Sequence, residues 1–318
     1  MKIVALEIKN IGSDIDSSMF NELGEFVAYE KTNIDDMQER CKDAEVIIIN
    51  KLPINKYTIE DLDKLKLILV TATGYDNVDT EYCKSRGIAV CNVKGYSTRS
   101  VVQHTFALLF YLYEKLSYYD NYVKSGEYIK NDIFTHFDNT FYNLFGKTWG
   151  IVGLGEIGSG VAGIASMFGC RVIYYSTSGN NNNYYFERVE FDELLRDSDI
   201  ISIHAPLNDA TRNLFNKETF KKMKNSAYLI NVGRGSIVNE EDLVEAIEKG
   251  EIEAAGLDVI SREPMDENSP LRKLKDSDRL IVTPHIAWAT KESRTKCMKG
   301  VYDNLKAFIN GESLNRIV

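Results

Sequence analysis

The chain has 318 residues, with 38 Lys and Arg against 47 Asp and Glu and a net charge of −9. A single hydrophobic core rarely grows beyond about 250–300 residues, so the length predicts two domains. The acidic balance, without any run rich in Lys or Arg, argues against nucleic acid and against an anionic membrane surface as partners.

The sequence also shows no membrane or secretory signal. No apolar run approaches the roughly 20 residues of a membrane-spanning helix, and residues 1–6 are typical of a first strand rather than of a signal peptide. The five cysteines are scattered and form no C-x-x-C pair, as expected for reduced thiols that pack in a core. The lack of a membrane or secretory signal predicts a cytoplasmic protein. With only four histidines and no cysteine cluster, we expect no metal site.

The first third of the chain predicts a parallel α/β lobe. Four apolar runs are typical of buried strands, at residues 3–6, 45–50, 67–71 and 88–92. A long helix is expected over residues 99–119, with Ser97 or Thr98 as its N-cap. An aromatic, irregular segment follows at residues 134–145 and is interpreted as a bridge between lobes.

The rest of the chain predicts a second and larger sheet. Six strands are expected, at residues 151–152, 172–175, 200–205, 228–232, 255–259 and 280–283, which is the number in a full doubly wound sheet. Residues 291–309 predict a further helix that packs back on the first lobe. The asparagine run at residues 180–183 is interpreted as a solvated loop.

One motif in this second part carries chemistry. Residues 150–158 (GIVGLGEIG) join an apolar strand to a helix, expected at residues 159–168, through glycines spaced as G-x-G-x-x-G. In a dinucleotide-binding turn, Gly153 permits the tight turn, Gly155 lets the backbone approach a pyrophosphate, and Gly158 lets the helix pack on its strand. The next predicted strand completes a βαβ unit, so we expect a nicotinamide cofactor.

These residues resemble the D-2-hydroxyacid dehydrogenase family. Six motifs occur in that family's order, at residues 153–158, 204–207, 231–235, 256–259, 262–264 and 283–288, and two more at residues 72–79 and 92–98. The resemblance implies two doubly wound parallel-sheet domains: a flavodoxin-like substrate domain of residues 1–98 and 288–318, and a Rossmann NAD(P)-binding domain of residues 99–287. It also implies a homodimer. Residues 92–104 and 285–288 look most like the branch of glycerate dehydrogenases and hydroxypyruvate reductases.

Three residues fit the catalytic requirements of such an enzyme. Interconversion of a 2-oxo acid and a 2-hydroxy acid needs a cation for the carboxylate and a group that exchanges the hydroxyl proton. Arg234 can hold the carboxylate with its planar fork and polarise the C2 oxygen. His285 follows a predicted strand and suits proton exchange near neutral pH. Glu263 would hydrogen-bond the imidazole and favour its protonated form.

The other histidines fit less well. His104 lies in an apolar helical run and is expected to form an interior hydrogen bond or to neighbour the site. His204 ends a strand where the family contacts the adenosine half of the cofactor, and for His136 the sequence indicates no catalytic role. Asp258 is the family's candidate for binding the nicotinamide carboxamide.

The resemblance also implies the remaining site residues. The cofactor set comprises Gly153, Gly155, Glu156, Ile157, Gly158, Ser176, Ala205, Pro206, Val232, Gly233 and Asp258. The residues expected to bind or shape the substrate are Lys51, Leu52, Thr73, Gly74, Tyr75, Tyr96 and Trp288. The substrate would be a small 2-oxo or 2-hydroxy acid of the glyoxylate, hydroxypyruvate or pyruvate type.

The choice between NAD and NADP stays open at this stage. The position after the second strand that usually holds an acid for the adenosine ribose is aligned with Ser176, so a 2′-phosphate is not repelled. No Arg or Lys occurs in the loop through Asn183 to attract that phosphate, and NAD is therefore favoured with NADP possible.

Alternative functions are a non-catalytic NAD(H) sensor of the corepressor type and a phosphite dehydrogenase. The lack of long tails argues against the sensor, whereas the motifs do not exclude phosphite dehydrogenase. Formate dehydrogenase is disfavoured because that branch carries a glutamine at the position of Glu263. A phosphoglycerate dehydrogenase with a regulatory module is disfavoured because the chain ends at Val318.

Overall fold

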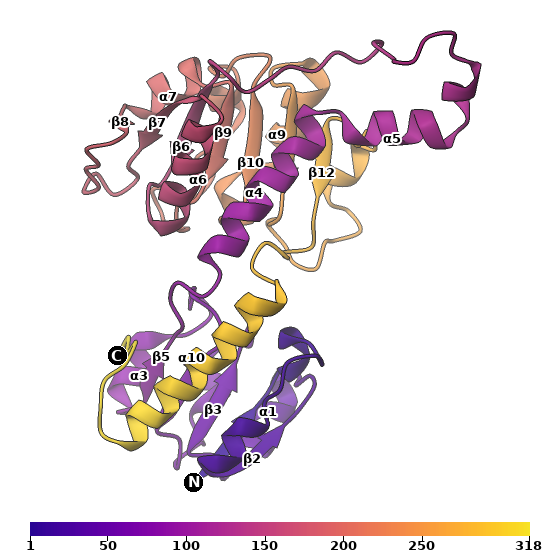
Figure 1. The fold of residues 1–318 in the computed structure, drawn as a ribbon. Coiled ribbons are helices and arrows are strands. Elements are labelled where there is room, and N and C mark those ends of the chain that lie inside the picture. Colours follow the sequence, from indigo (N-terminus) through magenta and orange to yellow (C-terminus); the bar gives the residue numbers. More distant parts are fainter. The chain divides into compact units, whose positions relative to one another are not determined.

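A computed structural model describes all residues, 1–318. The chain folds into two compact units, one of Met1–Ser97 with Ala289–Val318 and the other of Thr98–Trp288 (Figure 1). Each unit is an open sheet of parallel strands with helices on both faces, which confirms the predicted fold class. No helix combines the length and the apolar character that a membrane crossing requires.

The first unit contains a five-stranded sheet. Its strands are β1 (Lys2–Ala5), β2 (Glu25–Ala28), β3 (Val46–Ile49), β4 (Leu67–Val70) and β5 (Ala89–Cys91). They lie in the order β2-β1-β3-β4-β5, which is the flavodoxin-like order. The central strands read VIII and LILV and are wholly buried, as parallel strands covered on both faces require.

The edge strand β2 was not predicted from the sequence. Its four residues, EFVA, have no fully buried member, because β2 pairs only with β1 at the border of the sheet. Such a short, half-exposed strand lacks the continuous apolar run on which the prediction relied.

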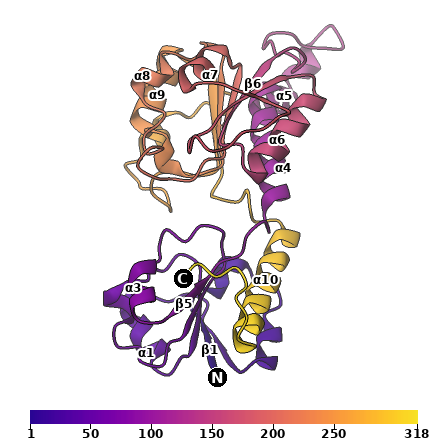
Figure 2. The same cartoon turned by 90° about the vertical axis from the view of Figure 1, so that its left-hand side faces the viewer.

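Helices cover both faces of this five-stranded sheet (Figure 2). They are α1 (Met37–Cys41), α2 (Lys56–Ile59), α3 (Thr80–Ser85) and α10 (Lys291–Ile309), with 3-10 turns at Ile8–Ile11, Ser18–Glu22 and Ile34–Asp36. The helix expected over residues 291–309 is present with the same bounds. It packs closely on Val93, because Gly300 has no side chain at the contact: a Cβ there would lie only 2.6 Å from the side chain of Val93.

The second unit contains seven parallel strands rather than the six that were predicted. They are β6 (Thr148–Val152), β7 (Arg171–Tyr175), β8 (Glu187–Arg188), β9 (Ile200–Ile203), β10 (Tyr228–Asn231), β11 (Ala254–Leu257) and β12 (Leu280–Val282). The prediction missed β8 because its two residues are charged and exposed. In the order β12-β11-β10-β9-β6-β7-β8, the direction of strand addition reverses between β6 and β9. Ligands of doubly wound sheets bind at that reversal.

Two apolar clusters hold helices to the two faces of this sheet (Figure 2). Its helices are α4 (Thr98–Tyr113), α5 (Leu116–Lys124), α6 (Glu156–Met167), α7 (Phe191–Asp197), α8 (Lys217–Phe220) and α9 (Glu240–Lys249), with 3-10 turns at Glu127–Lys130, Gly235–Ile237 and Pro270–Lys273. Along β10, Tyr228 and Ile230 pack in the cluster of α4 and α6, whereas Leu229 packs in that of α7 to α9. This alternation follows from the two-residue repeat of a strand.

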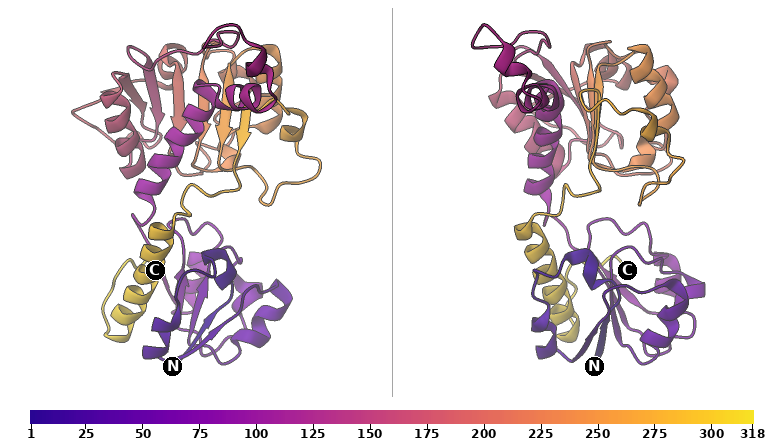
Figure 3. Two further views of the ribbon diagram at one scale, coloured as in Figure 1. Left: turned by 45° about the vertical axis from the view of Figure 1, so that its right-hand side comes forward. Right: turned by 90° about the vertical axis from the view of Figure 1, so that its right-hand side faces the viewer.

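The long helix expected over residues 99–119 is in fact two helices. It breaks between α4 and α5 at Lys115, whose φ of 53° is left-handed. The side chain of Lys115 is buried and its Nζ lies 3.0 Å from Glu253 Oε1. After the break, α5 and the chain that returns to β6 form an arm that projects from the body of this unit (Figure 3).

Candidate active site

The glycine turn after β6 has the geometry of a phosphate cradle. Gly153 has a φ of +90°, and a Cβ there would lie 2.9 Å from the backbone of Ala205. A Cβ on Gly158 would lie 2.3 Å from the carbonyl oxygen of Gly153. A Cβ on Gly155 would meet nothing within 4 Å, so two glycines close the turn and the third leaves open space in front of it.

Helix α6 begins in this open space. Its first residue is Glu156 rather than the predicted Ser159, and its N-cap is Gly155, which has no side chain to accept the first backbone N–H groups. Glu156 and Ile157 therefore lie in the first turn, where a helix dipole and unpaired N–H groups attract an anion. This turn fits the pyrophosphate of a dinucleotide cofactor.

Turns from the neighbouring strands meet the glycine turn. Ala205 and Pro206 follow β9, and Val232 and Gly233 follow β10. A Cβ on Gly233 would lie 3.1 Å from the carbonyl oxygen of Ala205, so these two turns are in contact. The structure thus brings together most of the residues that the sequence assigned to the cofactor, at the carboxyl edge where strand order reverses.

The turn after β7 is closed by its own hydrogen bonds. Ser176 is only 4% exposed, and its hydroxyl accepts from the backbone N–H of Asn181 at 3.2 Å. The side-chain amide of Asn181 donates to the carbonyl oxygen of Leu154 in the glycine turn. The loop after β7 is therefore bonded to the phosphate cradle.

A cation that the sequence of this loop does not indicate also lies beside it. The guanidinium of Arg188, in β8, donates to Gly179 O at 2.9 Å and to Asn182 Oδ1 at 3.0 Å. The loop through Asn183 holds no Arg or Lys of its own, but strand pairing of Tyr174 with Arg188 carries a positive charge to it.

Arg234 stands at the end of β10 in a turn that Asn231 braces. The Asn231 side chain is fully buried, accepts from Gly233 N at 3.0 Å and donates to Arg234 O at 3.0 Å. The guanidinium of Arg234 donates to Gly233 O at 3.0 Å. The motif at residues 231–235 includes Asn231 but indicates no role for it, and its amide is what fixes the backbone of this turn.

His285 and Glu263 form a hydrogen-bonded pair, as the sequence predicted. His285 Nδ1 lies 2.7 Å from Glu263 Oε2, and the two side chains are 23% and 30% exposed. The second carboxylate oxygen of Glu263 accepts from Ile260 N at 3.3 Å. With Nδ1 engaged by the carboxylate, the pair has the arrangement of a general acid and the group that orients it.

Asp258 anchors the segment that carries His285. It is 1% exposed, and its carboxylate accepts from the backbone N–H of Ile286 and Ala287 at 2.8 Å each and from the Thr283 hydroxyl at 2.6 Å. Although burial alone would raise the pKa of Asp258, the hydrogen bonds from His104, Thr283 and these two amides together lower it. This anchor holds His285 in its left-handed conformation, with a φ of 54°. Binding of a carboxamide by Asp258 stays a prediction.

The other histidines have structural partners. His104 Nε2 lies 3.0 Å from Thr283 Oγ1, which agrees with an interior hydrogen bond. His204 Nε2 lies 2.9 Å from the hydroxyl oxygen of Ser202. Burial lowers the pKa of His204 to about 3, so its imidazole is neutral. His136 stacks on Tyr122 with ring centroids 3.8 Å apart, in the arm.

The residues predicted to contact the substrate belong mostly to the first unit. Lys51 and Leu52 follow β3, residues 73–75 follow β4, and Tyr96 precedes Ser97, the last residue of that segment. Trp288 is the last residue of the second unit. Thr73 donates its hydroxyl to Val93 O at 2.9 Å, and Tyr75 is 39% exposed.

Comparison with known proteins gives a consistent result. Residues 106–287 match the model of the D-isomer specific 2-hydroxyacid dehydrogenase NAD binding domain. The chain is 38% identical to a hydroxypyruvate reductase of Blautia hydrogenotrophica, with 99% of each chain covered. It is 36% identical to a glycerate dehydrogenase of Methylorubrum extorquens, with 99% of this chain and 98% of the relative covered.

A solved structure agrees with these relatives. A D-lactate dehydrogenase of Aquifex aeolicus, in complex with NAD and lactic acid, superimposes with a TM-score of 0.84 at 27% identity, over 98% of this chain and 96% of that one. The chain therefore belongs to the D-isomer specific 2-hydroxyacid dehydrogenases, enzymes that transfer a hydride between a nicotinamide cofactor and a 2-hydroxy or 2-oxo acid.

Proposed function

We propose that this enzyme reduces small 2-oxo acids of the hydroxypyruvate and glyoxylate type to the D-2-hydroxy acids. The observation that carries the proposal is the pair of His285 and Glu263, joined at 2.7 Å. It belongs to the same unit as the open glycine turn before α6. When bound there, a nicotinamide cofactor supplies or accepts the hydride.

Each residue of the catalytic set has a distinct task in the proposal. Arg234 binds the substrate carboxylate, because its guanidinium can form two parallel charge-assisted hydrogen bonds. His285, protonated and oriented through Nδ1, donates a proton from Nε2 to the C2 oxygen during reduction and accepts it during oxidation. Glu263 stabilises the imidazolium and fixes the ring.

The substrate class rests on the relatives. Oxidation of glycerate at C2 gives hydroxypyruvate, so the names glycerate dehydrogenase and hydroxypyruvate reductase describe one reaction in two directions. A small polar substituent on C3 is therefore the favoured side chain. Lys51, Thr73, Gly74, Tyr75 and Trp288 are the residues proposed to contact the substrate.

We also propose that the enzyme favours NADH and accepts NADPH. Ser176 offers no negative charge against a 2′-phosphate, and Arg188 brings a positive one to the same loop. Because Arg188 is exposed, solvent and salt screen its attraction for the 2′-phosphate of NADPH. The preference for NADH over NADPH should therefore be modest.

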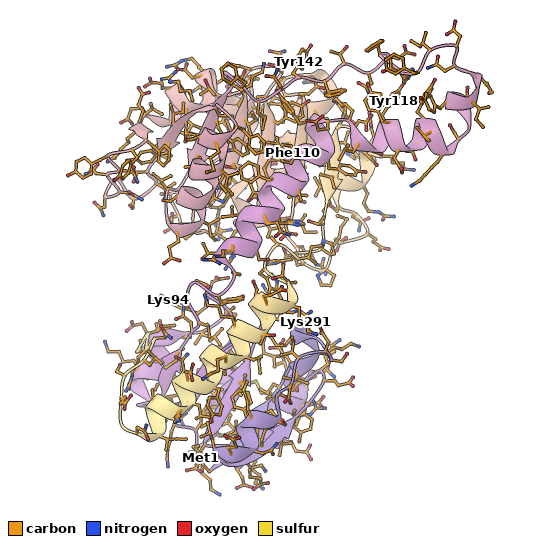
Figure 4. All side chains as sticks on the ribbon, in the orientation of Figure 1. Met1, Lys94, Phe110, Tyr118, Tyr142 and Lys291 are labelled. Atoms are coloured by element: carbon orange, nitrogen blue, oxygen red, sulfur yellow. The ribbon has the colours of Figure 1, made fainter.

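A homodimer is the proposed assembly, formed through the arm. Many apolar side chains in and beside the arm are more than half exposed, namely Val123, Ile129, Phe134, Phe137, Tyr142 and Phe145. Figure 4 shows Tyr118 and Tyr142 on this arm among other aromatic side chains. Exposed apolar surface of this kind marks an interface, and a second copy in a twofold dimer is the commonest occupant. With five buried, unpaired cysteines and a charge of −9, the assembly is proposed to act in the cytoplasm without nucleic acid or membrane.

The test of the function is a panel of 2-oxo acids, with turnover followed by nicotinamide absorbance using NADH and NADPH in parallel. Turnover of hydroxypyruvate and glyoxylate in the presence of NADH is the expected result. Cofactor binding without turnover of any 2-oxo acid would favour a sensor, and turnover of phosphite instead would favour a phosphite dehydrogenase.

The pH dependence tests the roles of His285 and Glu263. Reduction requires protonated His285, so its rate should fall as the pH rises through one limb of the profile. In Glu263→Gln the charge that favours the imidazolium is lost, and this limb should move to lower pH. A limb that does not move would show that Glu263 is not the functional partner of the imidazole.

A further inference from the structure

Glu240 is a buried acidic residue outside the catalytic set that contacts the turn of Glu263. It is the first residue of α9 and is 7% exposed. Its carboxylate Oε1 accepts from the backbone N–H of Ser261 at 2.5 Å. Ser261 precedes Glu263 by two residues, in the turn after β11. A carboxylate on one helix thus holds the backbone of the turn that presents Glu263 to His285.

The same turn is in close contact with the turn of Arg234. A Cβ on Gly235 would lie 1.9 Å from the carbonyl carbon of Ile260 and 2.4 Å from Ser261 N. Only a glycine allows this approach, so the backbone after Arg234 rests directly on the peptide that joins Ile260 to Ser261. Any shift of that peptide would displace the backbone beside Arg234 as well.

Two carboxylates hold successive N–H groups of this peptide segment. Ile260 N donates to Glu263 Oε1, and Ser261 N donates to Glu240 Oε1. The first bond is long, at 3.3 Å, whereas the second is short, at 2.5 Å. Glu263 therefore depends for its position on a backbone segment that Glu240, on another element, also holds.

We propose that Glu240 is a positioning residue for the catalytic pair. By holding Ser261 N, it keeps the carboxylate of Glu263 at hydrogen-bond distance from His285, so that the ring stays oriented and the negative charge stays beside it. This inference rests on the proposed function, since it requires that His285 donates the proton and that Glu263 supports it.

The general role of an acid at a helix N-terminus does not account for Glu240. Glu241 and Asp242 also lie in the first turn of α9 and can interact with its dipole. Glu241 is exposed to solvent, whereas Glu240 is buried and directed to another turn. Burying a carboxylate is costly unless its hydrogen bonds offset the cost, so the bond to Ser261 is the contact that accounts for its position.

A pocket beside Glu240 makes the test practical. The pocket has a volume of about 350 Å³, and Glu240 and Ser261 are among the residues that line it. Because the pocket is open to solvent, water can fill the space left when the side chain of Glu240 is shortened. The charged residues around it are Arg212, Glu241, Arg262 and Asp266. Arg262 pairs with Asp266, and the groups beside His285 and its anchor are Glu263, Asp258 and His104. All of them are retained in every Glu240 variant.

The experiment compares Glu240→Ala, Glu240→Asp and Glu240→Gln, with Glu241→Ala as the matched control on the same helical turn. Each full-length variant is assayed for reduction of hydroxypyruvate across pH, and its Tm is measured. Loss of an outer group that orients a reacting side chain typically costs about 10-fold or more, so Glu240→Ala should lower kcat by about that factor. Its reductive limb should move to lower pH, in the direction expected for Glu263→Gln, with cofactor affinity unchanged.

The other variants separate positioning from folding. Glu240→Gln keeps an oxygen that can accept from Ser261 N, so its profile should return toward that of the wild type. Glu240→Asp keeps the charge, but its side chain is too short to reach Ser261 N. It should therefore lower kcat and move the pH limb as expected for Glu240→Ala, and it provides the test if the alanine variant does not fold. Glu241→Ala should leave kcat and the pH limb unchanged.

The outcomes distinguish this inference from the function on which it rests. If Glu263→Gln moves the limb while Glu240→Ala and Glu240→Asp change only Tm, Glu240 has a purely structural role and the inference is overturned. If Glu263→Gln itself leaves the limb in place, Glu263 is not the functional partner of His285, and the positioning role of Glu240 is overturned with it.

Discussion

The two sheets of this protein treat the turns at their carboxyl edges in opposite ways. In the first unit, Glu7 follows β1 and its Oε2 accepts from three successive backbone N–H groups, those of Asn50, Lys51 and Leu52, at 2.8 to 3.0 Å. In the second unit, the turn after β6 has no side-chain acceptor, and the space before Gly155 is open. One protein thus contains a filled anion cradle and an unfilled one.

The difference separates stability from ligand binding. Backbone N–H groups that converge at a strand end attract an anion whatever its source. Where the chain supplies its own carboxylate, the turn is fixed in the folded protein, as in the first unit. Where glycine stands instead, the acceptor must come from a ligand, which is why the second unit holds the cofactor.

The largest effect is expected at Arg234, on the ligand-binding edge. Arg234→Ala removes the proposed carboxylate clamp, and the loss of a bidentate charge-assisted contact should lower kcat/KM by about a hundredfold or more, or roughly 3 kcal/mol. Cofactor affinity should change little. Steady-state kinetics and a cofactor titration check both points, with Arg196→Ala, an exposed residue of α7, as the control. Unchanged kcat/KM would remove Arg234 from the mechanism.

Gly155→Ala tests the unfilled cradle directly. The added methyl group meets no protein atom within 4 Å and Gly155 has an extended backbone, so Tm should stay that of the wild type. The methyl group would nevertheless occupy the approach to the pyrophosphate and should raise the cofactor Kd about tenfold or more.

Gly158→Ala is the contrasting variant for that cradle. Its Cβ would lie 2.3 Å from Gly153 O, so it should lower Tm as well as affinity. Calorimetric Tm and a fluorescence titration of NADH separate the two effects. Wild-type affinity in Gly155→Ala would mean that the pyrophosphate binds elsewhere.

Glu7→Ala tests the filled cradle. Removing the common acceptor of three backbone N–H groups should lower the free energy of unfolding by about 2 kcal/mol, because charge-assisted hydrogen bonds are lost and the amides are only partly rehydrated. The cofactor Kd of the second unit should not change. Urea unfolding and the same NADH titration measure the two quantities, with the exposed Glu30→Ala as the control. Wild-type stability in Glu7→Ala would show that the carboxylate of Glu7 does not stabilise the turn that it fills.

The smallest effect is expected at Arg188. Arg188→Ala should lower kcat/KM with NADPH by only a few fold and leave the NADH value unchanged, since an exposed cation near a phosphate is screened by solvent and salt. Arg196→Ala, which removes an exposed cation of α7, is the control. A complementary variant, Ser176→Asp, should disfavour NADPH through like-charge repulsion. If neither variant changes the ratio of NADPH to NADH use, another part of the loop contacts the ribose.

Much of the fold could be predicted because its signals are local. A glycine turn that joins an apolar strand to a helix is typical of a dinucleotide-binding sheet, and the runs in β3, β4 and β9 are long enough to indicate buried strands. The pair of His285 and Glu263 was predicted from motif order. Its distance of 2.7 Å came only from the folded chain.

The missed features are those in which the local signal is weak or misleading. Strands β2 and β8 are short, lie at sheet edges and expose charged residues, so no apolar run marks them. The break at Lys115 carries no proline or glycine, and an ion pair between the buried Lys115 side chain and the partly exposed Glu253, distant in sequence, stabilises it. Arg188 lies beyond the loop through Asn183, which has no Arg or Lys of its own, and pairing of β7 with β8 brings its side chain back to that loop.

The sequence by itself determined the class of sheet, the dinucleotide turn and the residues proposed to react, because each depends on residue type and spacing along the chain. Only the tertiary structure decided which groups support them. Asn231 braces Arg234, Asp258 anchors the segment of His285, and Glu240 holds the turn of Glu263, through hydrogen bonds to backbone atoms. A backbone N–H or carbonyl is the same at every residue, so the sequence does not specify which one a side chain will bind until the chain has folded.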